Sequence, residues 1–325
     1  MQSLRQLAIL TRLTAAEMLR QPICVLIAAV CVVLTTAVPL ITAHNFGESG
    51  RLARDSGLAF QLMFGLALAG YAACATLQRE RESGTLAAVL SKPVGRWTFF
   101  VAKFLGIIPV IVIFSLCAGL STLLAHRIAL RATIDAGFLI DHRTAWLVML
   151  CPIAACAVGA WANYRLKRAF PSTALLSLAL FLSLVTFACG YFTREGHWQA
   201  YNPQLQWHIL AASLLVTFAL IVLAAIALSL AVRLPLTPTV AICFGLLLLG
   251  LASDYTFGGG DRHCCCAGYL YALIPNWQNF WMADALAGGG TLPPAYVLRA
   301  AAYALLYTTG ALSLGGAAFQ YAEAS

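Results

Sequence analysis

Long apolar runs, each bounded by charged or turn-forming residues, recur along the whole chain. A helix needs about 20 such residues to cross the hydrocarbon core of a bilayer. We predict eight spans, at residues 22–43, 57–77, 104–125, 144–163, 169–193, 207–232, 238–256 and 296–320. The pattern therefore predicts an all-α, polytopic helical membrane protein with a single transmembrane domain over residues 1–325.

Two cytoplasmic features flank these runs. Only Arg165-Leu166-Lys167-Arg168 joins the fourth run to the fifth, which predicts a tight helical hairpin. Residues 1–21 are predicted to form an interfacial helix on the anionic cytoplasmic leaflet, because apolar and basic residues alternate there. The residues concerned are Leu4, Leu7, Ala8 and Leu13 with Arg5, Arg12 and Arg20. A solvated basic tail is the alternative.

Composition supports the membrane assignment and excludes a soluble protein. Hydrophobic residues make up 61% of the chain and charged residues 10%, against about 45–50% and 25% in soluble domains. With the N-terminus in the cytoplasm, the cytoplasmic segments carry the whole net charge of +8, and the outer segments balance to zero. The positive-inside rule thus explains the basic balance without nucleic acid as a partner. The even span count places both termini in the cytoplasm.

Several chemistries are disfavoured by what the sequence lacks. The predicted spans hold almost no ionisable side chain, whereas ion-coupled carriers bind their ion on such groups. None of the three lysines, Lys92, Lys103 and Lys167, follows a glycine. The Gly-Lys-Ser/Thr core of a phosphate-binding P-loop is therefore missing, and we expect neither ATPase activity nor catalytic residues in this chain.

Two short strings in the outer loop offer rival chemistry. His263 precedes Cys264-Cys265-Cys266, but adjacent residues lack the spaced pairs of a zinc site. A disulfide or plain loop cysteines are favoured, and no metal site is predicted. Gly258-Gly259-Gly260-Asp261 fits the Gly-x-Gly-Asp string of intramembrane aspartyl proteases. A glycine-rich loop explains it as well, because such a protease needs two facing carboxylates and Asp254 is the only nearby acid.

The densest charge cluster lies in residues 78–103, on the cytoplasmic side between the second and third spans. Ser83 is placed to cap a short helix, and Pro93 ends it. The apolar face of this helix consists of Leu86, Val89 and Leu90. An ordinary interfacial loop is the alternative.

At this segment the sequence resembles the permease (transmembrane) subunits of type-2, export-class ABC transporters. The motif consists of Glu80, Glu82, Gly84, Thr85, Leu86, Leu90, Lys92, Pro93, Arg96 and Lys103. One position departs from the family pattern, since Ala102 stands where glycine usually precedes the last lysine. A second stretch of resemblance comprises Ile274, Pro275, Asn276, Phe280, Asp284, Leu286, Tyr296, Tyr303, Tyr307 and the terminal Phe319-Gln320-Tyr321-Ala322-Glu323. Such permeases usually have six spans, so about six to eight transmembrane helices are expected.

The resemblance implies a division of labour between two kinds of subunit. A separate cytoplasmic ABC ATPase binds ATP and Mg, so this chain needs no cofactor of its own. Residues 78–103 then carry a coupling helix that seats in the ATPase and transmits its closing motion to the spans. The docking residues are Glu80, Arg81, Glu82, Gly84, Thr85, Leu86, Leu90 and Pro93, with Arg96 and Lys103 as anchors. The resemblance also implies a homodimer, or a dimer with a sister permease, in the bacterial cytoplasmic (inner) membrane.

The outer loop, residues 257–295, is predicted to hold an interfacial or re-entrant helix, because aromatic rings and amides gather between Gly268 and Leu286. By resemblance, the outer end of the translocation path is closed by Pro275, Asn276, Trp277 and Phe280. A passive aromatic belt is the alternative.

The uncharged spans predict a hydrophobic or amphiphilic substrate. The rival functions are a non-transporting membrane anchor or signalling subunit and, less favoured, the aspartyl protease.

Overall fold

The computed structural model describes residues 2–42, 49–82, 95–129, 131–133, 137–192, 197–201, 205–253, 274–282 and 292–321. Within these residues the chain is almost entirely helical. The helices are α1 (Gln2–Leu19), α2 (Pro22–Ile41), α3 (Ser49–Glu82), α5 (Arg96–Ile128), α6 (His142–Leu166), α7 (Phe170–Ala188), α8 (His208–Ala231), α9 (Leu236–Leu251) and α13 (Pro294–Tyr321). A hairpin of β1 (Arg131–Thr133) and β2 (Gly137–Leu139) and a 3-10 turn, η2 (Trp277–Phe280), complete the described elements.

Seven of the described helices are long and apolar enough to cross a membrane, namely α2, α3, α5, α6, α7, α8 and α13. The remaining predicted span, at 238–256, corresponds to α9, whose 16 residues make it shorter than the others. Its length of about 24 Å falls below the roughly 30 Å of the hydrocarbon core. The all-α membrane class and the range of six to eight helices are thus confirmed.

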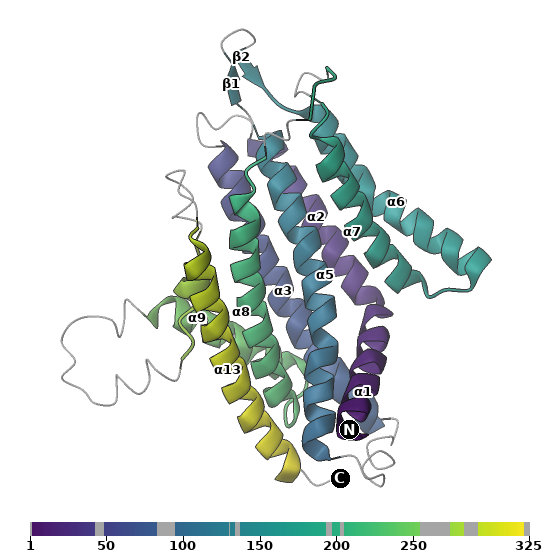
Figure 1. The fold of residues 1–325 in the computed structure, drawn as a ribbon, viewed down its shortest axis with the longest axis vertical. Helices are drawn as coiled ribbons and strands as arrows, with labels where there is room; N and C mark the ends of the chain where they lie inside the picture. Colours follow the sequence, from purple (N-terminus) through teal and green to yellow (C-terminus); the bar gives the residue numbers. More distant parts are fainter. Residues whose placement is uncertain are drawn as a thin grey trace, which may run out of the picture.

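The bundle is built around α5, which packs against α1, α2, α3 and α8. Figure 1 shows both chain ends at one end of the bundle and the β1–β2 hairpin at the other, with the α6–α7 pair on one flank and α13 on the opposite flank. The core between α3 and α8 contains a buried polar clamp. Gln61 Nε2 donates to the carbonyl oxygen of Ser213 at 3.0 Å, and the Ser213 hydroxyl donates to Gln61 Oε1 at 2.9 Å. An interhelical pair of this kind satisfies polar groups that lipid cannot.

The N-terminal helix α1 packs along α5 rather than standing apart from the bundle. Thr14 and Met18 are buried, and a Cβ on Gly106 of α5 would lie only 2.5 Å from Thr14, so the two backbones approach closely. The opposite face of α1 exposes Ile9 and Leu13 together with Arg5 and Arg12. This exposed face keeps the mixed apolar and basic character expected of an interfacial helix.

Candidate functional site

The structure describes only the two ends of the predicted coupling segment. Glu80, Arg81 and Glu82 form the last turn of α3, so this part of the motif continues a membrane-spanning helix. The central motif residues Gly84, Thr85, Leu86, Leu90 and Pro93 lie outside the described residues. Their docking role therefore stays a prediction.

The chain resumes at α5, and the first turn of α5 is fixed to the last turn of α13. The Arg96 guanidinium donates to the backbone oxygen of Gln320. The rings of Phe99 and Phe100 stack on Phe319, with centroid distances of 6.0 and 5.8 Å. A segment that moves the start of α5 therefore also moves the end of α13.

Lys103, the second predicted anchor, is packed into the bundle one turn beyond these rings. Its side chain is 3% exposed, and its ammonium lies 5.3 Å from the centre of the Phe99 ring. A cation over an aromatic face is attracted by the electron-rich ring, and the attraction grows as water is removed. Lys103 thus contacts the same aromatic cluster that joins α5 to α13.

At the outer predicted site, residues 274–282 insert between α8, α9 and α13. Trp277 and Phe280 are each only 2% exposed, and the Trp277 indole donates to the backbone oxygen of Leu246 in α9 at 3.0 Å. Pro275 packs against Gly250 of α9. A Cβ added to Gly250 would lie only 2.3 Å from the Pro275 backbone oxygen. The two rings therefore belong to the protein interior rather than to a lipid-facing aromatic belt.

Hydrogen bonds from α13 hold this inserted segment. The Tyr303 hydroxyl accepts from the backbone N–H of Asn276 at 2.9 Å, and the Tyr296 hydroxyl donates to the oxygen of Asn279 at 2.8 Å. The Asn276 side chain accepts from the N–H of Gln278 at 2.9 Å, which starts the η2 turn. The described part of the loop contains this four-residue turn, whose polar groups bond to α9 and α13. The rest of the region where we predicted an interfacial or re-entrant helix lies outside the described residues.

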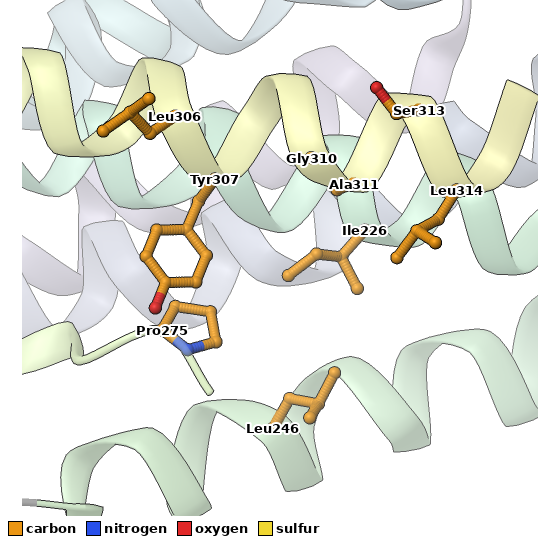
Figure 2. Close-up of a pocket in the computed structure, with 9 residues that line it drawn as sticks. All are labelled: Ile226, Leu246, Pro275, Leu306, Tyr307, Gly310, Ala311, Ser313 and Leu314. Atoms are coloured by element: carbon orange, nitrogen blue, oxygen red, sulfur yellow. The ribbon is translucent and has the colours of Figure 1, made fainter. Parts of the chain in front are cut away.

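An apolar cavity of about 690 Å³ lies beside the inserted segment, between α8, α9 and α13. Figure 2 shows Tyr307 over Pro275, with Ile226, Leu246 and Leu314 on the walls. The remaining lining residues are Leu306, Gly310, Ala311 and Ser313. The lining contains no charged side chain, so this cavity suits an apolar or weakly amphiphilic group and offers no acid–base chemistry.

The sequence motif identified two residues of this lining, Pro275 and Tyr307, but not the other walls of the cavity. Ile226 and Leu246 lie in ordinary apolar runs, and nothing in their local pattern distinguishes them from lipid-facing residues. Only the packing of α9 against the 274–282 segment brings them together.

The rival sites predicted from the outer loop are not placed by the structure. Asp254, Asp261, His263 and the cysteine triplet lie outside the described residues. Among the residues that are described, no group of three or more His, Cys, Asp or Glu side chains could hold a metal ion.

Comparison with known families places residues 11–210 in one of them. The matching family model is described as ABC-2 family transporter protein, and the matched residues include α2 to α7, the coupling segment and the start of α8. A comparison with curated proteins found no match.

Proposed function

Because the chain belongs to the ABC-2 transporter family and is a multi-pass membrane permease component, not itself catalytic, we propose that it moves an amphiphilic substrate using ATP hydrolysed by a separate subunit. The absence of a Gly-Lys-Ser/Thr string supports a separate ATPase. That partner would bind ATP and Mg and dock on the coupling segment through Glu80, Arg81, Glu82, Gly84 and neighbouring motif residues.

The single observation that carries this proposal is the path along α13. At one end Phe319 stacks on Phe99 and Phe100, which lie in the last part of the coupling segment. About 24 Å away along the helix, Tyr303 holds the backbone of Asn276 in the proposed outer gate. A displacement of α5 by an ATPase would therefore reach Asn276 and Trp277 through one continuous helix.

The cargo follows from the cavity beside this gate. Its walls are apolar, and its polar groups are the Tyr307 and Ser313 hydroxyls. A substrate with a long hydrocarbon part and a small polar part fits that lining. Pro275, Asn276, Trp277 and Phe280 would then separate the cavity from the outer surface.

The assembly completes the proposal. We infer an exporter that works as a homodimer or with a sister permease in a bacterial inner membrane, with both termini in the cytoplasm. The charge distribution supports this orientation, because the segments predicted to lie in the cytoplasm carry the whole net charge of +8.

The test is co-purification from native membranes with an ATPase assay, comparing the wild type with Gly84→Pro plus Leu86→Asp. A nucleotide-binding subunit should accompany the wild type and be lost from the double variant, while the unfolding midpoint stays unchanged. A folded wild type that brings down no ATPase would contradict the proposal and favour a membrane anchor or signalling subunit.

A cavity-filling variant separates docking from cargo handling in the same assay. Gly310→Leu should keep the ATPase bound but abolish transport and substrate-stimulated hydrolysis, because a Cβ there meets nothing within 4 Å and the side chain grows into the cavity. Gly245→Leu is the matched control, since its Cβ also meets open space and Gly245 does not line this cavity. Equal transport by both variants would remove this cavity from the translocation path.

A further inference from the structure

A second cavity, of about 580 Å³, lies where the end of α1 meets the turn between α6 and α7. We call it the α6–α7 pocket. Arg20 contributes from the α1–α2 junction, Lys167 and Arg168 from the turn, and Ser172 and Leu176 from α7. It is separate from the apolar cavity between α8, α9 and α13, and its lining combines basic, polar and apolar side chains.

The turn that builds this pocket has a defined and costly backbone geometry. Lys167 has a φ of 55°, the left-handed conformation that usually ends a helix with glycine or asparagine. Its N–H donates to the oxygen of Ala162, and the Asn163 side chain donates to the oxygen of Arg168 at 2.9 Å. A non-glycine residue here costs roughly 1 kcal/mol, and strained conformations of this kind concentrate at functional positions.

The charges that line the α6–α7 pocket favour a bound anion. Three of its eight lining residues are cationic and none is acidic. Within the described residues, Arg20, Lys167 and Arg168 form no ion pair. The first turn of α7 adds to the positive potential, because its N-cap residue Ala169 provides no side-chain cap for the free N–H groups.

The rest of the surroundings favour a lipid over a small soluble anion. Leu176 forms the apolar wall, and from it a stripe of half-exposed leucines continues along α7 at four-residue spacing, through Leu180 and Leu184. On α6, Trp161 and Tyr164 are 59% and 77% exposed next to the turn, as expected of rings at the headgroup level of a bilayer.

We propose that the α6–α7 pocket binds the phosphate headgroup of an anionic glycerophospholipid whose acyl chain lies along the α7 leucine stripe. The headgroup is held by Arg20, Lys167 and Arg168, and so links the end of α1 to the start of α7. Basic pockets between transmembrane helices recognise anionic lipid headgroups in this way. Because α1 packs along α5, the bound lipid stabilises the N-terminal helix in its packed position.

The experiment measures phosphatidylglycerol binding to the purified full-length protein, by native mass spectrometry and by the shift in unfolding midpoint, with phosphatidylcholine as the neutral lipid. Lys167→Asn plus Arg168→Gln removes two cations while asparagine keeps the left-handed turn. Arg165→Gln plus Arg233→Gln is the matched control, because it removes the same charge from exposed positions outside the pocket.

We expect phosphatidylglycerol, and not phosphatidylcholine, to raise the unfolding midpoint of the wild type and of the control. The pocket variant should bind it about 30-fold more weakly, from about 1 kcal/mol for each basic residue near the surface. Equal binding by the pocket variant and the control would overturn the proposal. So would a full shift produced by inorganic phosphate alone, since the site would then be one for a soluble anion.

Discussion

Arg127 and Asp141 form a buried ion pair that joins the ends of α5, α6 and α7. Arg127 Nε lies 3.1 Å from Asp141 Oδ2, and neither residue is more than 4% exposed. The guanidinium also donates to the backbone oxygens of Cys189 and Phe192, and the carboxylate accepts from the Thr144 hydroxyl at 2.6 Å. The sequence indicates only that both charges lie on the outer side. Their pairing could not be predicted, because it depends on how three helices meet.

Replacing one partner of this pair should be strongly destabilising. Arg127→Met leaves a buried carboxylate without its cation, which costs about 3–5 kcal/mol. We expect a clear fall in the unfolding midpoint of the detergent-purified protein, whereas the exposed Arg233→Met should shift it little. Similar midpoints for the two variants would mean that water reaches the pair and screens it.

At the level of elements, the apolar pattern predicted where helices cross the membrane but not how far they extend. The predicted spans 57–77 and 104–125 correspond to α3 at 49–82 and α5 at 96–128. Both helices continue past their apolar runs into charged sequence. The span predicted at 169–193, in contrast, is longer than the helix α7 found at 170–188, because hydropathy does not mark where the backbone leaves the helix.

At the candidate site, too, the sequence identifies residues but not their contacts. The motif residues Asn276, Trp277 and Tyr303 could be singled out from the sequence, but not that Tyr303 accepts from Asn276 or that Trp277 donates to α9. Contacts between residues 27 or more positions apart depend on the tertiary arrangement, which a single sequence does not encode as a local pattern.

Two glycines of α13 provide a test of how tightly this helix is held. A Cβ on Gly315 would lie 2.8 Å from the backbone Cα of Ser229 in α8, whereas a Cβ on Gly310 meets nothing within 4 Å. Gly315→Ala should therefore lower the unfolding midpoint by forcing α13 away from α8. Gly310→Ala should leave it unchanged or raise it, because alanine favours the helix by about 1 kcal/mol. Equal effects in a thermal melt would show that α13 can shift freely along α8.

For the whole molecule, the place of the two termini constrains the membrane path. Figure 1 shows them at the same end of the bundle. Seven full crossings would place the two termini on opposite sides of a membrane, so we expect the short helix α9 to contribute an eighth crossing. The inserted residues 274–282 bond to the end of α9, where Gln278 Nε2 donates to the oxygen of Leu251 at 3.0 Å. This bond joins the inserted segment to the last residue of α9.

Thiol labelling of intact cells checks this path. In a cysteine-free background, we expect Arg131→Cys to react with a membrane-impermeant maleimide from outside, because β1 lies at the end of the bundle opposite the termini. Arg165→Cys and Arg233→Cys should react only after the membrane is opened, since the turns before α7 and α9 lie on the side of the termini in an eight-crossing path. If Arg233→Cys reacted from outside while Arg165→Cys stayed protected, the eight-crossing path would be wrong between α7 and α9. The proposed orientation of the gate would fall with it, because Trp277 and Phe280 would then face the ATPase side.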